Sequence, residues 1–276
     1  MDILSRPLLT ADHRIHYGAG PYQFGDLWIP QTQGKSLIPL VVFFHGGWWK
    51  SEYDLGYAGY LCQALKQEGI ATWSVEYRRV GETGGGWPAT FQDAAAGFDF
   101  AVTLAKNYPL DLSRVITMGH SAGGHLAFWV AGRHHIDAHS DIYQPRPQVP
   151  LRGAVALAGA VDLRLTIDLS GYFTFAHDKH EVYALMGGKP GDLPDRYKAG
   201  NPGELLPFQV PQLLIQGTAD DQIPAELPSR WAEMSRRQGG QVNVSILPST
   251  DHFDVVDPDS RAWGTVRDGV RKLFSS

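Results

Sequence analysis

The sequence is poor in cysteine and in charged residues. Cys62 is the only cysteine of 276 residues, so no disulfide can form within the chain and a disulfide-based secretory framework is unsupported. We interpret Cys62 as a small buried apolar residue rather than a nucleophile. Charged residues make up only 19% and hydrophobic residues 43% of the sequence, a balance that argues against disorder and allows a sizeable core.

Basic blocks and long apolar runs are also missing. The net charge is −5, so neither nucleic acid nor an anionic membrane surface is an expected partner. The longest apolar runs, such as Leu40 to Phe44, are far too short to cross a bilayer. Residues 1–16 lack the apolar stretch of a signal peptide. These absences predict a soluble, cytoplasmic protein with a single domain over residues 1–276.

Short apolar runs alternate with segments of helical periodicity along the chain. The first run partly alternates, which is typical of an outer, antiparallel strand, whereas the later runs suit buried parallel strands. This alternation predicts an α/β fold, with a mostly parallel twisted sheet and helices on both faces. The expected strands are 22–29, 37–44, 70–77, 114–118, 153–158, 212–216 and 242–247. The expected helices are 57–65, 91–102, 122–131, 227–234 and 263–274.

Residues 159–207 do not fit this alternation. The segment is too long for an ordinary connection, so we expect a small lid or cap insertion. It is rich in aromatic residues, and their exposure would favour a homodimer. The aromatic residues are Tyr172, Phe173, Phe175, Tyr183 and Tyr197.

The sequence from Gly119 to Gly123, Gly-His-Ser-Ala-Gly, joins an apolar β-branched run to an apolar helix. This is the G-x-S-x-G pattern in the strand–turn–helix setting of a nucleophile elbow. Small residues are needed there because the serine occupies a strained backbone position and neighbouring chain passes close to it. The pattern alone is short and common, so its weight depends on the residues that accompany it.

Ser121, Asp220 and His252 each follow the end of an expected strand. The order Ser, acid, His is that of the α/β-hydrolase fold, whereas other serine-hydrolase folds use other orders. The carboxyl ends of parallel strands lie at one edge of the sheet, so these three residues are able to converge there. That edge is also where ligands bind in such sheets. Asp221 is an alternative acid. We favour Asp220 because the acid of this fold usually stands three residues after the glycine.

Each of these residues has a role in acyl transfer. A serine hydroxyl is a poor nucleophile, so His252 would take its proton and later pass it to the leaving group. Asp220 would hold the other imidazole N–H. The oxyanion of the tetrahedral intermediate needs preorganised donors. The expected donors are the backbone N–H groups of Ala122, Gly47 and Trp48.

The candidates for the walls of the substrate pocket are His45, Trp49 and His120. They lie close in sequence to the expected oxyanion donors of residues 47–48 or to the nucleophile. His45 also suits a structural role in its loop, and Trp49 also suits the core. Asp251 adjoins His252, but we expect its side chain to point away and to remain a surface carboxylate.

No metal or cofactor is expected. Residues 133–148 hold His134, His135 and His139, but their spacing matches no metal-ligand pattern, so a solvated loop is favoured. The glycine-rich stretch from Gly81 to Pro88 lacks the ending of a phosphate-binding loop and is interpreted as a surface loop near the site. Hydrolysis by a Ser-His-Asp triad needs neither group.

Three motifs together resemble a known family. His45-Gly46-Gly47-Trp48-Trp49, Gly119-His120-Ser121-Ala122-Gly123-Gly124 and Asp251-His252-Phe253 resemble the signatures of kynurenine formamidase (arylformamidase)-like α/β-hydrolases, which are close to the carboxylesterase groups. Glu76-Tyr77-Arg78-Arg79 with Gly86-Trp87-Pro88 is similar to a stretch in bacterial members. The acid turn 217–221 is similar to that of prolyl-oligopeptidase-type domains. The resemblance implies the same triad and oxyanion hole, with the substrate set by residues 159–207.

The favoured function is therefore a serine hydrolase that cleaves a small carboxylic ester or an aryl formamide through an acyl-enzyme. Trp48 and Trp49 beside the oxyanion hole suggest a short acyl group and an aromatic leaving portion. A peptidase is the first alternative, from the acid turn, although no second domain would capture a peptide terminus. A non-catalytic binding module is the second, although such proteins usually lose a triad residue.

Overall fold

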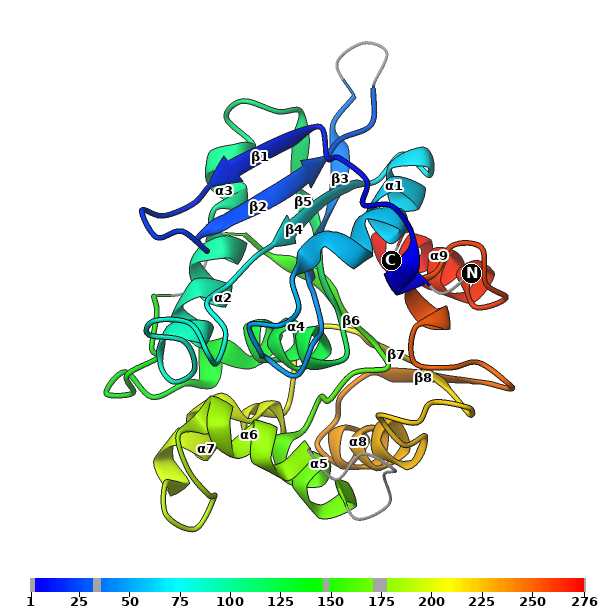
Figure 1. Cartoon of the computed structure of the whole chain (residues 1–276). Helices are drawn as coiled ribbons and strands as arrows, with labels where there is room; N and C mark the ends of the chain where they lie inside the picture. Colours follow the sequence, from blue (N-terminus) through cyan, green and yellow to red (C-terminus); the bar gives the residue numbers. More distant parts are fainter. Residues whose placement is uncertain (1–2, 32–35, 146–148, 171–177, 276) are drawn as a thin grey trace.

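A sheet of eight strands with helices on both faces forms the centre of the computed structural model, which describes residues 3–31, 36–145, 149–170 and 178–275 (Figure 1). The strands are β1 (His13–His16), β2 (Phe24–Trp28), β3 (Ile38–Phe44), β4 (Ala71–Val75), β5 (Leu110–His120), β6 (Leu151–Leu157), β7 (Gln212–Gly217) and β8 (Val242–Leu247). Their order is β1-β2-β4-β3-β5-β6-β7-β8. β1 and β2 pair antiparallel to their neighbours, and β3 to β8 run parallel. The predicted α/β-hydrolase-type sheet is confirmed.

Strand β3 is buried on both faces, as its unbroken apolar run predicts. Successive side chains of a strand point to opposite faces. Leu40 and Val42 accordingly join the core on one face of the sheet, and Val41 and Phe43 join the core on the other. The sheet therefore separates two apolar cores, and both must be covered by helices.

Helices α1 (Gly59–Gln67) and α9 (Trp263–Ser275) cover one face of the sheet, where their apolar stripes meet Val41 and Phe43 (Figure 1). The other face is covered by α2 (Ala89–Asp99), α4 (Ala122–Gly132) and α8 (Glu226–Arg237), with the short α3 (Ala101–Leu104) after α2. The 3₁₀ helices outside residues 159–207 are η1 (Ile3–Ser5), η2 (Leu55–Ala58), η3 (Arg133–His135) and η6 (Asp254–Val256).

Every residue of α4 is buried, because described residues of the segment 159–207 cover the side of α4 that faces away from the sheet. This segment contains α5 (Leu163–Leu169), α6 (Asp178–Met186), α7 (Pro194–Gly200) and the 3₁₀ helix η5 (Pro202–Leu205). On α4, Nε2 of His125 lies 2.9 Å from the carbonyl oxygen of Gly200. Nε1 of Trp129 donates to the carbonyl oxygen of Ala199 at 3.0 Å. The expected aromatic residues Tyr172, Phe173 and Phe175 lie outside the described residues.

Two elements differ from the sequence-based expectation. β1 is a polar strand without alternation, and it exists because it pairs with β2 at the sheet edge, where Arg14 Nε lies 2.8 Å from Asp26 Oδ1. β5 begins several residues earlier than predicted, because Leu110 pairs with Ile38 of β3 before the apolar run starts.

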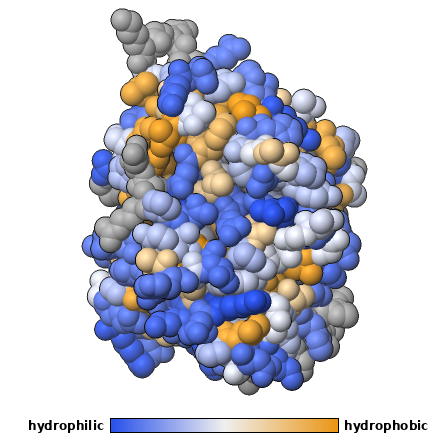
Figure 2. Space-filling view, turned by 90° about the vertical axis from the view of Figure 1, so that its left-hand side faces the viewer, coloured by the Kyte–Doolittle hydropathy of each residue, from blue (hydrophilic) through white to orange (hydrophobic). Residues whose placement is uncertain are grey.

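One face of the surface is mostly polar. The face on the left of Figure 1, drawn in Figure 2, is mostly hydrophilic, with apolar residues in small separate patches. Among the described residues, no helix combines the length and the apolar character needed to cross a membrane.

Candidate active site

Ser121 stands in the turn between β5 and α4, with a φ of 54° and a ψ of −122°. Residues other than glycine rarely adopt a positive φ, so this is a strained position. A Cβ added to Gly119 would lie 2.0 Å from the Gly123 carbonyl oxygen, and one added to Gly123 would lie 2.0 Å from the Phe44 carbonyl oxygen. Only glycine fits at these two positions, and the turn has the geometry of a nucleophile elbow.

The sheet brings Ser121, His252 and Asp220 to its carboxyl edge. Nδ1 of His252 lies 2.8 Å from Oδ2 of Asp220. Ser121 and His252 line the same cavity, and each side chain is almost fully buried. Asp251, beside His252, instead accepts hydrogen bonds from the backbone N–H groups of Phe253 and Asp254. The acid that meets the imidazole is therefore Asp220.

Four donors hold the carboxylate of Asp220. Besides His252, Gln216 Nε2 donates to Oδ2 at 2.7 Å, and the N–H groups of Gln222 and Ile223 donate to Oδ1 at 2.8 Å each. Burial by itself would raise the pKa of Asp220, but the hydrogen bond and charge of His252 and the two N–H donors outweigh it, so the pKa is lowered. The ionised carboxylate is thus oriented toward Nδ1 and leaves Nε2 of His252 for the cavity.

The loop after β3 has three consecutive residues with positive φ, namely Gly47 at 106°, Trp48 at 51° and Trp49 at 56°. Gly46 packs against the elbow, since a Cβ there would lie 2.9 Å from Ser121 Cβ. In the described part of the chain, the N–H groups of Gly47 and Trp48 have no protein acceptor, and both residues line the cavity with Ser121. These N–H groups are available to an oxygen atom inside the cavity.

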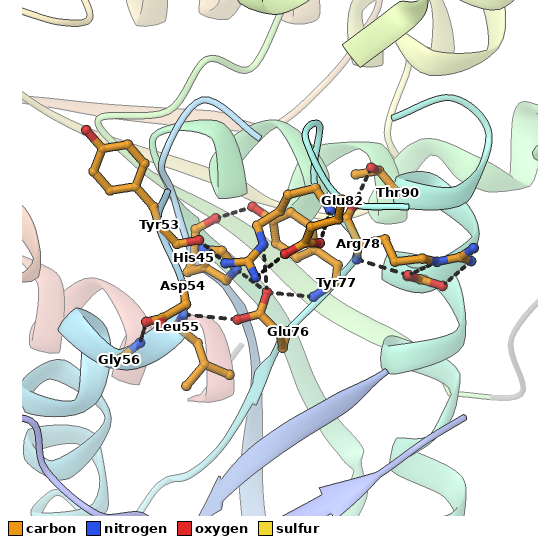
Figure 3. Close-up of polar contacts among 12 residues, drawn as sticks. His45, Tyr53, Asp54, Leu55, Gly56, Glu76, Tyr77, Arg78, Glu82 and Thr90 are labelled. Atoms are coloured by element: carbon orange, nitrogen blue, oxygen red, sulfur yellow. Dashed lines mark hydrogen bonds and ion pairs between the residues drawn. The ribbon is translucent and has the colours of Figure 1, made fainter. Parts of the chain in front are cut away.

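A buried carboxylate is hydrogen bonded to both ends of this loop. Glu76, directly after β4, is 1% exposed and accepts hydrogen bonds from His45 Nε2 at 2.9 Å, from the Tyr77 N–H at 3.0 Å and from the Leu55 N–H at 3.3 Å (Figure 3). Burial would raise the pKa of Glu76, but His45 and the guanidinium of Arg79, 3.5 Å away, outweigh it and lower the pKa. The ionised Glu76 therefore ties both ends of the loop to β4.

A chain of hydrogen bonds joins this loop to the loop that carries His252. The carbonyl oxygen of His252 can only accept, so Nε2 of His120, 2.9 Å away, carries the ring proton. Nδ1 of His120 then accepts from the Tyr57 hydroxyl at 2.7 Å, and the Tyr57 oxygen accepts from the Gly46 N–H at 2.7 Å. Burial and the neighbouring His252 lower the pKa of His120 to about 3, which keeps this single-proton form at neutral pH.

The cavity over Ser121 has a volume of about 110 Å³. His120, Gly47 and Trp48 line it together with Ser121. The residues that sequence reasoning did not assign to the cavity are Leu4, Tyr53, Tyr57, Gln222 and Phe253. No described residue of the segment 159–207 lines this cavity.

Two residues expected in the substrate pocket lie elsewhere in the structure. His45 is fully buried, because it is hydrogen bonded to Glu76 and its ring stacks on that of Tyr77 at 4.4 Å. Trp49 is fully buried in the core, where its ring meets that of His125 edge to face at 5.2 Å. Neither side chain lines the cavity. His45 therefore has a structural role in its loop, and Trp49 is a core residue.

Several supporting residues escaped sequence reasoning. Tyr57 counted only as part of a helical stripe, and Gln216 only as the last residue of a strand. Glu76 belongs to a stretch that the family resemblance marks, and this was the one signal that pointed toward it. Their partners come from other strands and loops, so spacing along the chain could not reveal them.

Replacing Tyr57 by Phe is expected to lower the free energy of unfolding by about 2 kcal/mol or more, because it leaves the Gly46 N–H and His120 Nδ1 unpaired in a buried place. Urea unfolding measures the change. Tyr60→Phe is the matched control, since the Tyr60 hydroxyl donates to the exposed Pro7 carbonyl and its loss should cost less than about 1 kcal/mol. Equal losses in the two variants would contradict the proposed hydrogen-bond chain.

The family model BD-FAE matches residues 26–233, a range that includes the loop after β3 and the elbow. The chain belongs to the BD-FAE family. The family match ends before His252, so the histidine of the site is identified from geometry.

Several known proteins similar to this chain are named as esterases. A probable isoprenylcysteine alpha-carbonyl methylesterase of Arabidopsis thaliana is 24% identical over 94% of this chain, and Esterase LipC of Mycobacterium tuberculosis is 26% identical over 88%. The chain spans 53% and 60% of the length of these two relatives. The structure of a truncated carbohydrate esterase from gut microbiota matches with a TM-score of 0.80 and 19% identity, covering 98% of both chains. These similarities support an α/β-hydrolase fold over nearly the whole chain.

Proposed function

We propose that this protein is a serine esterase that cleaves a small carboxylic ester through an acyl-enzyme. The observation that carries the proposal is the hydrogen bond of 2.8 Å between His252 Nδ1 and Asp220 Oδ2, beside a cavity that His252 shares with Ser121. A base oriented by a buried carboxylate next to a serine at an elbow is the arrangement that activates a hydroxyl group.

The reaction has two halves. Nε2 of His252 takes the proton of the Ser121 hydroxyl as Oγ attacks the ester carbonyl, and the resulting imidazolium gives that proton to the departing alcohol. Water then attacks the acyl-enzyme and gives a proton to Nε2 of His252. The imidazolium passes this proton to Oγ of Ser121 as the carboxylic acid leaves, which restores the free enzyme. Asp220 holds Nδ1–H throughout and stabilises the imidazolium that forms in each half.

The tetrahedral intermediate of each half carries a negatively charged oxygen. The N–H groups of Gly47 and Trp48 are the donors that we assign to it, together with that of Ala122 at the start of α4. The strained turn 47–49 is held by the hydrogen bond from Lys50 N–H to Gly47 O and by Glu76 below it, so the donors are oriented before substrate arrives.

Two observations favour a small ester over a peptide. Pockets for drug-sized ligands usually have about 300–1,000 Å³, whereas this cavity has about 110 Å³, enough for a short acyl group. The relatives described above are all named as esterases. An aryl formamide remains a second substrate class, because formyl is the smallest acyl group and fits the same cavity.

The test compares initial rates on p-nitrophenyl acetate, butyrate and octanoate, on N-formylkynurenine and on aminoacyl p-nitroanilides. We expect kcat/KM for acetate or butyrate to exceed that for octanoate by about tenfold or more, because the small cavity excludes the longer chain. A fluorophosphonate ester should add its phosphonyl group to Ser121, which mass spectrometry of the tryptic peptides would detect.

The other outcomes separate the alternatives. If N-formylkynurenine has the highest specificity constant, the protein is a formamidase, with the same triad acting on an amide bond. If only the anilides are cleaved, it is a peptidase and the ester proposal is wrong. If no substrate reacts and the phosphonate does not label Ser121, a non-catalytic binding module is the better description.

A further inference from the structure

The segment of residues 3–7, here called the N-terminal segment, reaches the mouth of the cavity over Ser121. Leu4, in the 3₁₀ helix η1, lines the cavity together with Trp48 and Phe253. Leu4 is 46% exposed, so one part of its side chain faces the cavity and another part faces solvent. An exposed leucine is ordinary by itself, so it is the place of Leu4 in the cavity lining, and not its exposure, that points to contact with a substrate.

The N-terminal segment is fixed to the loop that carries His252. The side chain of Ile3 is 4% exposed and packs in the core cluster that includes Val255 and Val256 of η6. The Arg6 guanidinium forms ion pairs with Asp257 and Asp259, with distances of 3.0 Å from Nη1 to Asp257 Oδ1 and to Asp259 Oδ2. Because Asp257 shortly follows His252, Arg6 connects the segment to the loop of the proposed base.

The other side of the N-terminal segment is fixed to α1. The Tyr60 hydroxyl donates to the Pro7 carbonyl oxygen at 2.9 Å, and the Arg6 guanidinium lies over the Tyr60 ring, 5.2 Å from its centroid. In Figure 1 the first described residues, in dark blue, accordingly lie beside α1 and α9. The segment therefore bridges the two parts of the chain that flank the cavity, and both anchors leave Leu4 at the mouth between them.

We propose that the N-terminal segment is a wall of the substrate pocket, with Leu4 as a specificity-determining residue that limits the length of the substrate chain beside it and Arg6 as the positioning residue that holds the wall in place. The ligand is an ester whose apolar acyl or alkoxy chain contacts Leu4. The proposal rests on the esterase function proposed above and adds the element that selects its substrates, which comes from residues 3–7 and not from the described part of 159–207.

The test uses Leu4→Ala with two substrate series, namely p-nitrophenyl esters of growing acyl chain and acetates of growing alcohol. In one of the two series, the ratio of kcat/KM for the longest chain to that for the shortest should rise at least threefold relative to the wild type. A ratio measured on one preparation does not depend on the fraction of folded enzyme. Leu8→Ala is the matched control, because Leu8 is 72% exposed and does not line the cavity. A change below threefold in both series would overturn the role of Leu4.

Arg6→Gln tests the anchor by a measurement that needs no activity. Hydrogen exchange should become faster in peptides covering residues 3–9, while the exchange of β3 to β8 stays unchanged. Arg267→Gln, which breaks an exposed ion pair with Asp268 on α9, is the control. Unchanged exchange in residues 3–9 would overturn the anchor. If the wild type cleaves no ester, the esterase proposal and the role of Leu4 in selectivity both fail, whereas unchanged ratios in an active, phosphonate-labelled enzyme refute only the role of Leu4.

Discussion

Ser121→Ala is expected to lower kcat on p-nitrophenyl acetate by at least about 10⁴-fold. The variant keeps the backbone of the elbow and the donors of Gly47 and Trp48, but it removes the atom that would form the acyl-enzyme. What remains is the stabilisation of the intermediate by the oxyanion donors, acting on water as nucleophile. Steady-state rates on a protein freshly purified from a host lacking its own esterases measure the loss.

The control for this prediction is Ser113→Ala. Ser113 lies on the same strand β5, but it is exposed and its hydroxyl donates to the neighbouring Asp111. It should keep kcat within about twofold, because an exposed substitution away from the site has little effect on the folded structure. A Ser121→Ala variant that retains more than a hundredth of the wild-type kcat would mean that another group is the nucleophile.

Asp220→Asn is expected to lower kcat by about 10⁴-fold. Where the NH₂ group of the new amide faces Nδ1 of His252, it donates and cannot accept, so it favours the wrong tautomer of His252. The structure adds a second cost, because Oδ2 of Asp220 accepts from Gln216 as well as from His252, so an NH₂ group at that position would face two donors. Rates across pH 5–9 measure the loss and show whether it persists at every pH.

The neighbouring Asp221 provides a sensitive control, because Asp221→Asn makes the same change of side chain one residue away from the acid. Asp221 is exposed, and it is Asp220 that receives the hydrogen bonds from His252, Gln222 and Ile223. Asp221→Asn should therefore leave kcat within about twofold. If Asp221→Asn lost activity and Asp220→Asn kept it, the assignment of the acid would be wrong.

Ser121→Ala and Asp220→Asn also distinguish the proposed function from the binding-module alternative. A non-catalytic module would keep its biological activity in both variants, whereas an esterase loses turnover in both. Because the Ser121 hydroxyl makes no hydrogen bond to a described residue, the stability of Ser121→Ala should stay near that of the wild type, and a loss of rate then reports on chemistry alone.

The elements that carry the site could be predicted because their signals are local. The apolar run of β3, the Gly-His-Ser-Ala-Gly turn and the His-Gly-Gly loop each determine a backbone shape over a few residues. The order of Ser121, Asp220 and His252 along parallel strands then leads to one edge of one sheet. The aromatic spacing of 159–207 has no such local signature, and its helices take their positions from packing on α4.

The sequence by itself determined the class of fold and led to the three residues of the proposed triad, whereas the order of the strands in the sheet came only from the structure. Only the tertiary structure decided what surrounds these three residues. His45 and Trp49 belong to the loop after β3, but both are buried in the interior. Leu4 is far from this loop in sequence, and it lines the cavity. The physical reason is that the wall of a cavity is set by contacts between distant segments, such as Arg6 with Asp257, and these depend on how whole elements pack and not on any spacing along the chain.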